Sequence, residues 1–236
     1  GQTATSEHYT NYVQGINGLM IDAVGLTNPG DLSAIDDFEF RVGNTSDLAT
    51  WSHAPMPLPV VVRPGAGIDG SDRITIIFDD HAIERQWIEV TVRATANTGL
   101  SVPDVFYFGN APGEAGDKAA NTIVNATDEI LARNFQHSAI DPAPINDPFD
   151  YNRDGLVNGS DQIIARNNQT NPLTMLRLIT AAAVDLAVEQ AAMESPNAAK
   201  AAIDWQYEYD RAQSKNMASR KNSDIEATVD MLLATD

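Results

Sequence analysis

The sequence predicts an α+β protein built from three successive parts. Residues 1–100 are expected to form an antiparallel β-sandwich, 101–170 a pair of loop-helix motifs, and 171–236 a helical tail. Three observations predict this order. Short β-branched runs separated by turn residues fill the first part, one segment of the second repeats at a constant offset, and Ala, Leu, Met, Glu and Gln dominate the third.

The amino-acid composition excludes several classes of function. The chain has 236 residues, 43% of them hydrophobic, so it can bury a core. It carries 33 acidic against 15 basic residues, a net charge of -18, which excludes a general nucleic-acid binder and favours cations, calcium first. The absence of cysteine excludes disulfides, zinc-thiolate sites and cysteine nucleophiles. No apolar run approaches the ~20 residues that a membrane span needs.

The strands of the sandwich are predicted from short runs that alternate or are β-branched. These runs are 16–22, 38–42, 60–62, 74–78 and 87–92. Pro-Gly and Asp-Gly pairs separate them, and no helical pattern lies between them. Pro55, Pro57 and Pro59 would interrupt a central strand, so they predict an edge strand or a loop. Strands at this spacing favour an antiparallel sandwich.

The second part contains an internal repeat. Val124–Asn134 matches Val157–Asn167 at a constant offset of 33 residues. Only two copies are present, which is too few for a solenoid. The repeat therefore predicts a duplicated loop-helix unit.

The second copy carries EF-hand spacing. From Asp150 to Asp161, side-chain oxygens stand at loop positions 1, 3, 5, 9 and 12, and Gly155 stands at position 6, where the loop bends sharply. Calcium takes six to eight oxygen ligands, and position 7 supplies only a backbone carbonyl. The alternative is an Asn/Asp-rich surface turn. The expected metal ligands are Asp150, Asn152, Asp154, Leu156, Asn158 and Asp161.

The first copy matches this pattern less completely. The same register places Asp117, Asn121, Asn125 and Asp128 at positions 1, 5, 9 and 12, but Ala119 at position 3. An inserted loop lies just upstream, and its Asn110 or Glu114 could supply missing oxygens. Alternatively, this copy has lost its metal and kept only its fold.

Residues 104–170 resemble dockerins through these two tracts, because dockerins carry two calcium loop-helix repeats with Asp at position 12. The resemblance implies pseudo-two-fold symmetry and docking on a cohesin. The extended first loop and the long tail depart from the family. The positions expected to face the partner are Ala126, Thr127, Ile130 and Asn134 in one copy, and Gly159, Ser160, Ile163 and Asn167 in the other.

A second resemblance concerns Gly65–Arg73 and Asp104–Ala111. These segments are similar to ones at the C-terminal ends of large extracellular proteins of planctomycete-type bacteria, where a β module precedes a dockerin-like pair. The arrangement is also similar to the X module beside some dockerins, an analogy of fold alone. It implies an extracellular or cell-surface location. Because no signal peptide opens the chain, we expect a mature form or a fragment of a longer protein.

The tail is predicted to be helical from its composition. Helix-forming residues dominate Pro172–Ala192, Ser195-Pro196 restarts a helix, and Ser223–Glu226 forms a capping box for a last one. The apolar stripe that includes Leu176 and Ile179 is most simply a packing face. The tail could also pair with itself and make a homo-oligomer.

These features together predict a non-catalytic, calcium-stabilised protein–protein docking module with a cohesin-like partner. We expect no catalytic residues, since no HExxH, GxSxG, P-loop or Rossmann pattern is present. One alternative is a carbohydrate-binding accessory module that stacks a polysaccharide on Trp51 or Trp87, although both are more simply core residues. Another is a fragment of a hydrolase whose catalytic part lies elsewhere.

Overall fold

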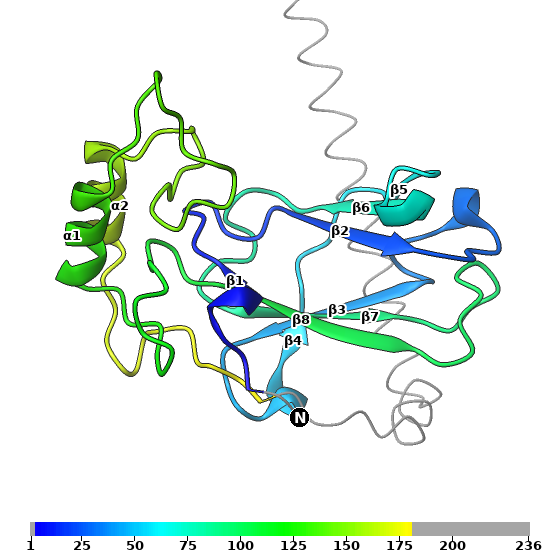
Figure 1. Cartoon of the computed structure of the whole chain (residues 1–236). Coiled ribbons are helices and arrows are strands. Elements are labelled where there is room, and N and C mark those ends of the chain that lie inside the picture. The colour runs from blue at the N-terminus through cyan, green and yellow to red at the C-terminus, as the bar shows by residue number, and fades with distance from the viewer. Residues whose placement is uncertain (1–2, 181–236) are drawn as a thin grey trace, which may run out of the picture. The chain divides into compact units, whose positions relative to one another are not determined.

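The computed structural model describes residues 3–180. The chain divides into two compact units, 1–184 and 185–236, and the second lies outside the described residues. The described part is a mixed α+β fold with two β-sheets and two α-helices, as Figure 1 shows. The predicted α+β class is therefore confirmed.

The larger sheet has five strands in the order β1-β8-β7-β3-β4. All neighbours are antiparallel except β1, which runs parallel to β8. Its strands are β1 (Tyr9–Thr10), β3 (Phe38–Gly43), β4 (Ser52–His53), β7 (Trp87–Val92) and β8 (Asp104–Asn110). The predicted strands 38–42 and 87–92 are confirmed. This sheet also includes β8, which lies beyond residue 100. The sandwich boundary expected at residue 100 therefore falls one strand too early.

The smaller sheet has three antiparallel strands in the order β2-β6-β5. They are β2 (Gly18–Ala23), β5 (Val61–Arg63) and β6 (Asp72–Ile77), which confirms the other three predicted strands. The proline-rich stretch around Pro57 forms a loop, as expected. Four short 3-10 helices occupy the connections at Ser6–His8, Pro29–Asp31, Leu48–Thr50 and Ile68–Gly70.

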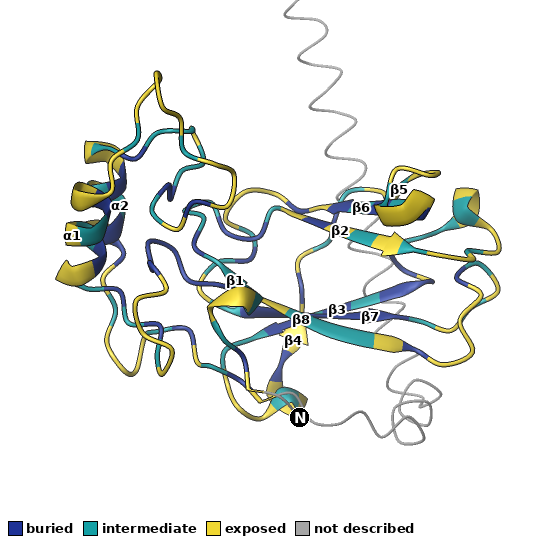
Figure 2. Cartoon of the chain, viewed as in Figure 1, coloured by how far each residue is buried: buried dark blue, intermediate teal, exposed yellow. Residues whose placement is uncertain are grey.

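The main core lies between the two sheets. Alternate residues of β3 are buried, with Phe38 and Phe40 both 0% exposed. Ile74 and Ile76 of β6 are buried on the opposing sheet. The Phe40 ring meets that of Phe78 edge-on, with centroids 5.6 Å apart. The sheets thus pack face to face in a sandwich-like core (Figure 2).

A second apolar cluster covers the outer face of the five-stranded sheet. Trp87 is 0% exposed and packs with Leu176 and Ile179. Its indole Nε1 donates to the carbonyl of Arg177 at 2.7 Å. Gly109 makes room for this segment, because an added Cβ would lie 2.9 Å from Leu176 Cδ2.

Residues 171–180 contain no helix, so the predicted helical tail is wrong over this stretch. Its end runs beside the start of the chain, where the amide of Ala4 donates to the carbonyl of Ile179 at 2.8 Å. Packing of Leu176 and Ile179 against Trp87 overrides the helical composition. The remaining tail, 181–236, and with it the predicted self-association, lies outside the described residues.

The repeat forms two helices of nine residues, α1 (Ala126–Asn134) and α2 (Gly159–Asn167). Each begins with an Asn cap and an Asp at the third helical position, which together form a capping box. Buried Ala132 and Ala165 let the helices approach closely. The carbonyl of Val124 accepts the amide of Thr170 at 2.9 Å.

The second copy makes the corresponding bond, with its acceptor 33 residues further along the chain and its donor 33 residues earlier. There the carbonyl of Val157 accepts the amide of His137 at 3.1 Å. The residue that precedes the Asn cap of each unit therefore pairs with the segment that follows the other unit's helix. This reciprocal pairing, together with the matching caps, makes the two units structural duplicates.

Truncating a fully buried aromatic of the inner face should destabilise the sandwich far more than truncating a partly exposed one. Phe38→Ala is expected to lower the free energy of unfolding by about 3–5 kcal/mol, because it leaves a cavity beside the stacked Phe40 ring. The matched control is Phe108→Ala, whose side chain is 37% exposed on the same sheet and should cost about 1 kcal/mol. Urea denaturation measures both, and equal losses would contradict this core.

Candidate functional site

The second acidic loop is folded around the carboxylate that begins it. Asp150 is 2% exposed. Its Oδ2 accepts the amide of Gly155 at 2.9 Å, and its Oδ1 accepts the amide of Asp154 at 3.3 Å. Gly155 has φ of 80°, a left-handed conformation that favours glycine, as the loop spacing required. The loop therefore has the sharp bend that the sequence predicts.

A second buried carboxylate closes this loop onto α2. Asp161 is 0% exposed. One of its oxygens accepts the amide of Tyr151 and the other that of Asn158, both at 2.9 Å. Burial raises the pKa of Asp161, while these two hydrogen bonds lower it. Asp161 thus holds the beginning of the loop against the beginning of the helix.

The other expected ligands of this loop bond to its own chain. Asn152 Oδ1 accepts the amide of Asp154 at 3.1 Å, and Asp154 Oδ1 accepts the amide of Leu156 at 2.8 Å. Asn158 Oδ1 caps α2 by accepting the amide of Ser160 at 2.7 Å. The loop is well ordered by these bonds. Its carboxylates do not form a converging group of three within the described residues.

The first loop is closed by the same pair of bonds. Asp128 is 0% exposed; its Oδ1 accepts the amide of Ala115 at 2.9 Å and its Oδ2 that of Asn125 at 2.8 Å. Ala115 therefore corresponds to the residue that follows Asp150. Glu114, rather than Asp117, occupies the first position. The first loop spans 15 residues from Glu114 to Asp128, against 12 in the second.

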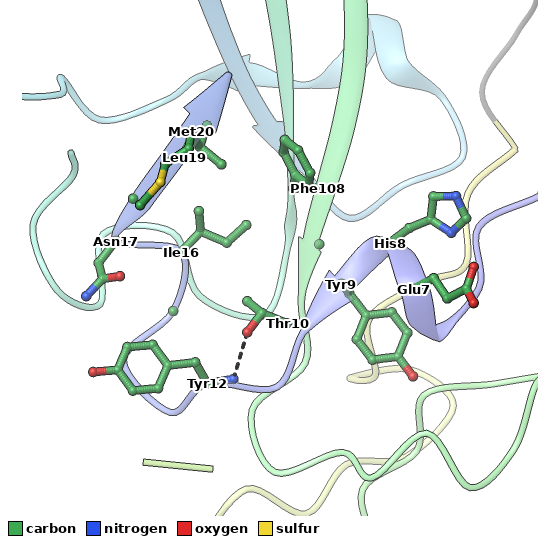
Figure 3. A pocket seen from close by; sticks show the side chains of 13 residues that line it. Glu7, His8, Tyr9, Thr10, Tyr12, Ile16, Asn17, Leu19, Met20 and Phe108 are labelled. Carbon is green, nitrogen blue, oxygen red and sulfur yellow. Dashed lines mark hydrogen bonds between the residues drawn. The ribbon is translucent and has the colours of Figure 1, made fainter. Parts of the chain in front are cut away.

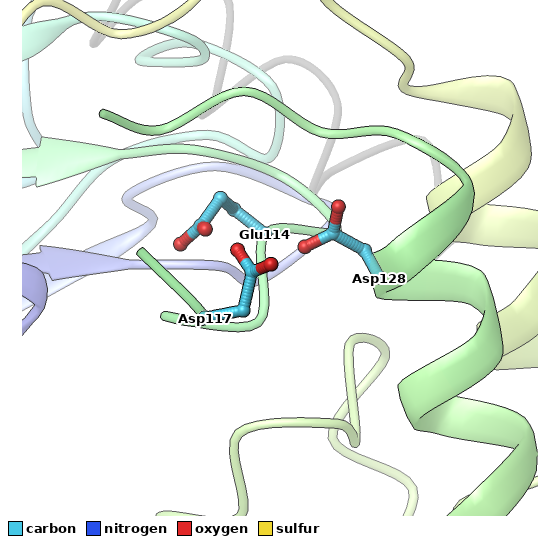
Figure 4. Close-up of side chains that lie close together, drawn as sticks. All are labelled: Glu114, Asp117 and Asp128. Atoms are coloured by element: carbon cyan, nitrogen blue, oxygen red, sulfur yellow. The ribbon is translucent and has the colours of Figure 1, made fainter. Parts of the chain in front are cut away.

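Three acidic side chains converge in this longer loop (Figure 4). Glu114, Asp117 and Asp128 each bring one carboxylate oxygen within 4.8 Å of the others. Glu114 and Asp128 are buried, whereas Asp117 is exposed. Burial raises the pKa of Glu114 to about 7, and it also raises the pKa of Asp128. Such a group of hard oxygen donors suits a divalent cation.

The two remaining predicted ligands of the first loop lie outside this group of three carboxylates. Asn121 Oδ1 accepts the amide of Ile123 at 3.1 Å, and Asn125 Oδ1 accepts the amide of Thr127 at 2.8 Å. Asn121 thus stabilises the loop locally, and Asn125 caps α1. Glu114, which the sequence offered only as an alternative, is the residue that the structure adds to Asp117 and Asp128.

All eight predicted partner-facing positions are exposed, and all of them lie on α1 and α2, whose outer faces Figure 2 shows as exposed. Ile130 is 42% and Ile163 is 52% exposed. Its neighbour Ile164 packs against the helical core instead. The exposed positions are Ala126, Thr127, Ile130, Asn134, Gly159, Ser160, Ile163 and Asn167.

The tryptophans that a sugar platform would need are core residues. Trp51 is 7% and Trp87 is 0% exposed, so neither offers a free ring face. A separate cavity of about 390 Å³ lies between β2 and the end of β8 (Figure 3). Aliphatic and aromatic side chains line much of it, including those of Leu19 and Phe108. This cavity contains none of the predicted site residues.

Comparison with protein-family models, with curated proteins and with solved structures found no match in any of the three. In the described part of the chain, no helix has the length and apolar character that crossing a membrane requires.

The buried Glu114 carboxylate should make the calcium-free protein less stable as pH rises. Its pKa is about 7 when folded against 4.5 ordinarily, so the folded state binds the proton more tightly. The stabilisation of the folded state by this bound proton is complete below pH 4.5 and is lost as pH rises through 7. Relative to Glu114→Gln, the wild type should lose on the order of 3 kcal/mol across this window. Urea denaturation with chelator at several pH values measures the difference, and parallel profiles would contradict it.

Proposed function

We propose that this protein is a calcium-stabilised, non-catalytic docking module that acts outside the cell and binds a cohesin-like protein. One observation carries the proposal. Two structurally duplicated units each bury the acidic residue that closes their loop, while the residues in the predicted docking positions are exposed. Metal in the loops and a partner on the helices account for both features.

Calcium fits the loops on physical grounds. Asp128, Asp150 and Asp161 are nearly or fully buried in a chain with 33 acidic and 15 basic residues. Buried carboxylates are unfavourable unless hydrogen bonds or a cation compensate their charge. An ion that binds the folded loop and not the unfolded chain shifts the equilibrium toward the folded state.

Protein docking fits the exposed helix positions. Ile130 and Ile163 occupy equivalent positions in the repeat, and both remain substantially exposed. Small or hydroxyl-bearing residues at the helix starts, such as Thr127 and Ser160, leave room for a partner's backbone and offer hydrogen bonds. An apolar centre with a polar rim is typical of a protein interface.

Calcium should raise the thermal stability of the full chain. At a free calcium concentration 100 times its dissociation constant, one site contributes about 2.7 kcal/mol. For a protein of this size the melting temperature then rises by roughly 5–10 °C relative to chelator. Asp150→Asn should reduce this rise, because it removes a negative oxygen from the second loop. The matched control is Asp141→Asn, whose carboxylate is 86% exposed outside both loops. Identical melting curves with calcium and chelator would refute a calcium-stabilised fold.

Docking should depend on the exposed helix positions. Surface plasmon resonance against a panel of purified cohesin domains is expected to show binding with calcium and none with chelator. Ile163→Arg should weaken that binding at least tenfold, because it buries a charge at the interface. Ile140→Arg is the control, since Ile140 is 97% exposed outside the helices. Binding that survives Ile163→Arg, or no binding to any domain of the panel, would count against the proposed partner.

A further inference from the structure

The first loop contains a buried polar atom that has no partner among the described residues. Glu114 is 1% exposed. Its Oε2 accepts the amide of Gly116 at 2.8 Å and the hydroxyl of Tyr9. Its Oε1 is buried and makes no hydrogen bond within residues 3–180. A buried carboxylate oxygen without a partner is costly, so a ligand that satisfies it would stabilise the loop.

The neighbours of this carboxylate identify the ligand's charge. One oxygen from each of Glu114, Asp117 and Asp128 lies within 4.8 Å of the other two. Three carboxylates this close repel one another unless a proton neutralises one of them or a cation lies between them. Burial of Glu114 and Asp128 strengthens the repulsion, while exposed Asp117 leaves a path for an ion and for water ligands.

We propose that Glu114, Asp117 and Asp128 bind a divalent cation, with calcium as the first choice, and that this ion fastens the first strand of the sandwich to the loop. The site rests on the calcium-binding part of the proposed function, but it adds Glu114 to Asp117 and Asp128 in place of the two asparagines that the repeat assigns. A set of carboxylate oxygens with room for water matches calcium's preference for hard donors and flexible geometry. Neither Asn121 nor Asn125 is required.

The link to the sandwich runs through Tyr9. Its hydroxyl donates to Glu114 Oε2, while its backbone belongs to β1, beside Gly109 of β8. A cation on the other Glu114 oxygen holds the carboxylate in place for this hydrogen bond. Tyr9 is therefore a positioning residue rather than a ligand.

Calcium titration of the full chain by isothermal calorimetry tests the ligand set. The chelator-treated wild type is expected to bind two ions, one in each loop. Glu114→Gln and Asp117→Asn should each leave one ion, and Asp150→Asn should leave the other one. Asp141→Asn should retain both.

Asp117→Asn keeps the test informative even where a change at Glu114 perturbs folding, because Asp117 is exposed. Two ions retained in both Glu114→Gln and Asp117→Asn would overturn the inference, as would a single wild-type ion that Asp150→Asn removes. If Asp150→Asn still binds two ions while Glu114→Gln loses one, the result would support the first-loop site and contradict the second-loop site alone.

Hydrogen exchange of β1 tests the link. Calcium should slow exchange of the β1 amides at least tenfold in the wild type. Tyr9→Phe should retain both ions but lose this protection, since the ring remains and only the hydroxyl is removed. Unchanged calcium-dependent protection in Tyr9→Phe would show that the ion does not act on the strand through Tyr9.

Discussion

Each loop-helix unit depends on one buried carboxylate that joins the loop to its helix. Asp128 and Asp161 accept one amide from the beginning of the loop and one from the residue that caps the helix. These hydrogen bonds and the positive end of the helix dipole compensate part of the buried charge. The same bonds determine which residue begins the loop, where the helix starts and which helix face stays exposed.

Local chemistry explains what could be predicted from the sequence. The helix starts follow from Asn and Asp three residues apart, and five strands follow from β-branched runs, because neighbouring residues decide these features. By contrast, β1 and β4 have two residues each and leave no periodic signal. The segment that carries Leu176 and Ile179 has helical composition, yet its contacts with distant Trp87 decide its structure.

The candidate site was predicted in part, and the reason lies in loop length. A constant offset of 33 residues correctly pairs Asn125 with Asn158. The insertion in the first loop lies before Asn125, so it does not disturb this pairing. Extended further back, the same offset assigns the first position to Asp117. Only the hydrogen bond from Ala115 to Asp128 shows that Glu114 stands there. A comparison of the copies that allowed a three-residue gap would have offered Glu114 as the acidic counterpart of Asp150.

A single amide side chain connects the sandwich to both loops, which makes their folding interdependent. Asn11, just after β1, donates through Nδ2 to the carbonyls of Glu114 at 2.7 Å and Pro148 at 2.8 Å. Its Oδ1 accepts from Arg153 Nη2 at 2.6 Å. Only an amide offers two donors and one acceptor in this arrangement, since a carboxylate would face two carbonyl oxygens. Because Asn11 is 7% exposed, water cannot readily replace these bonds. Asn11 therefore joins both acidic loops to the chain directly after β1.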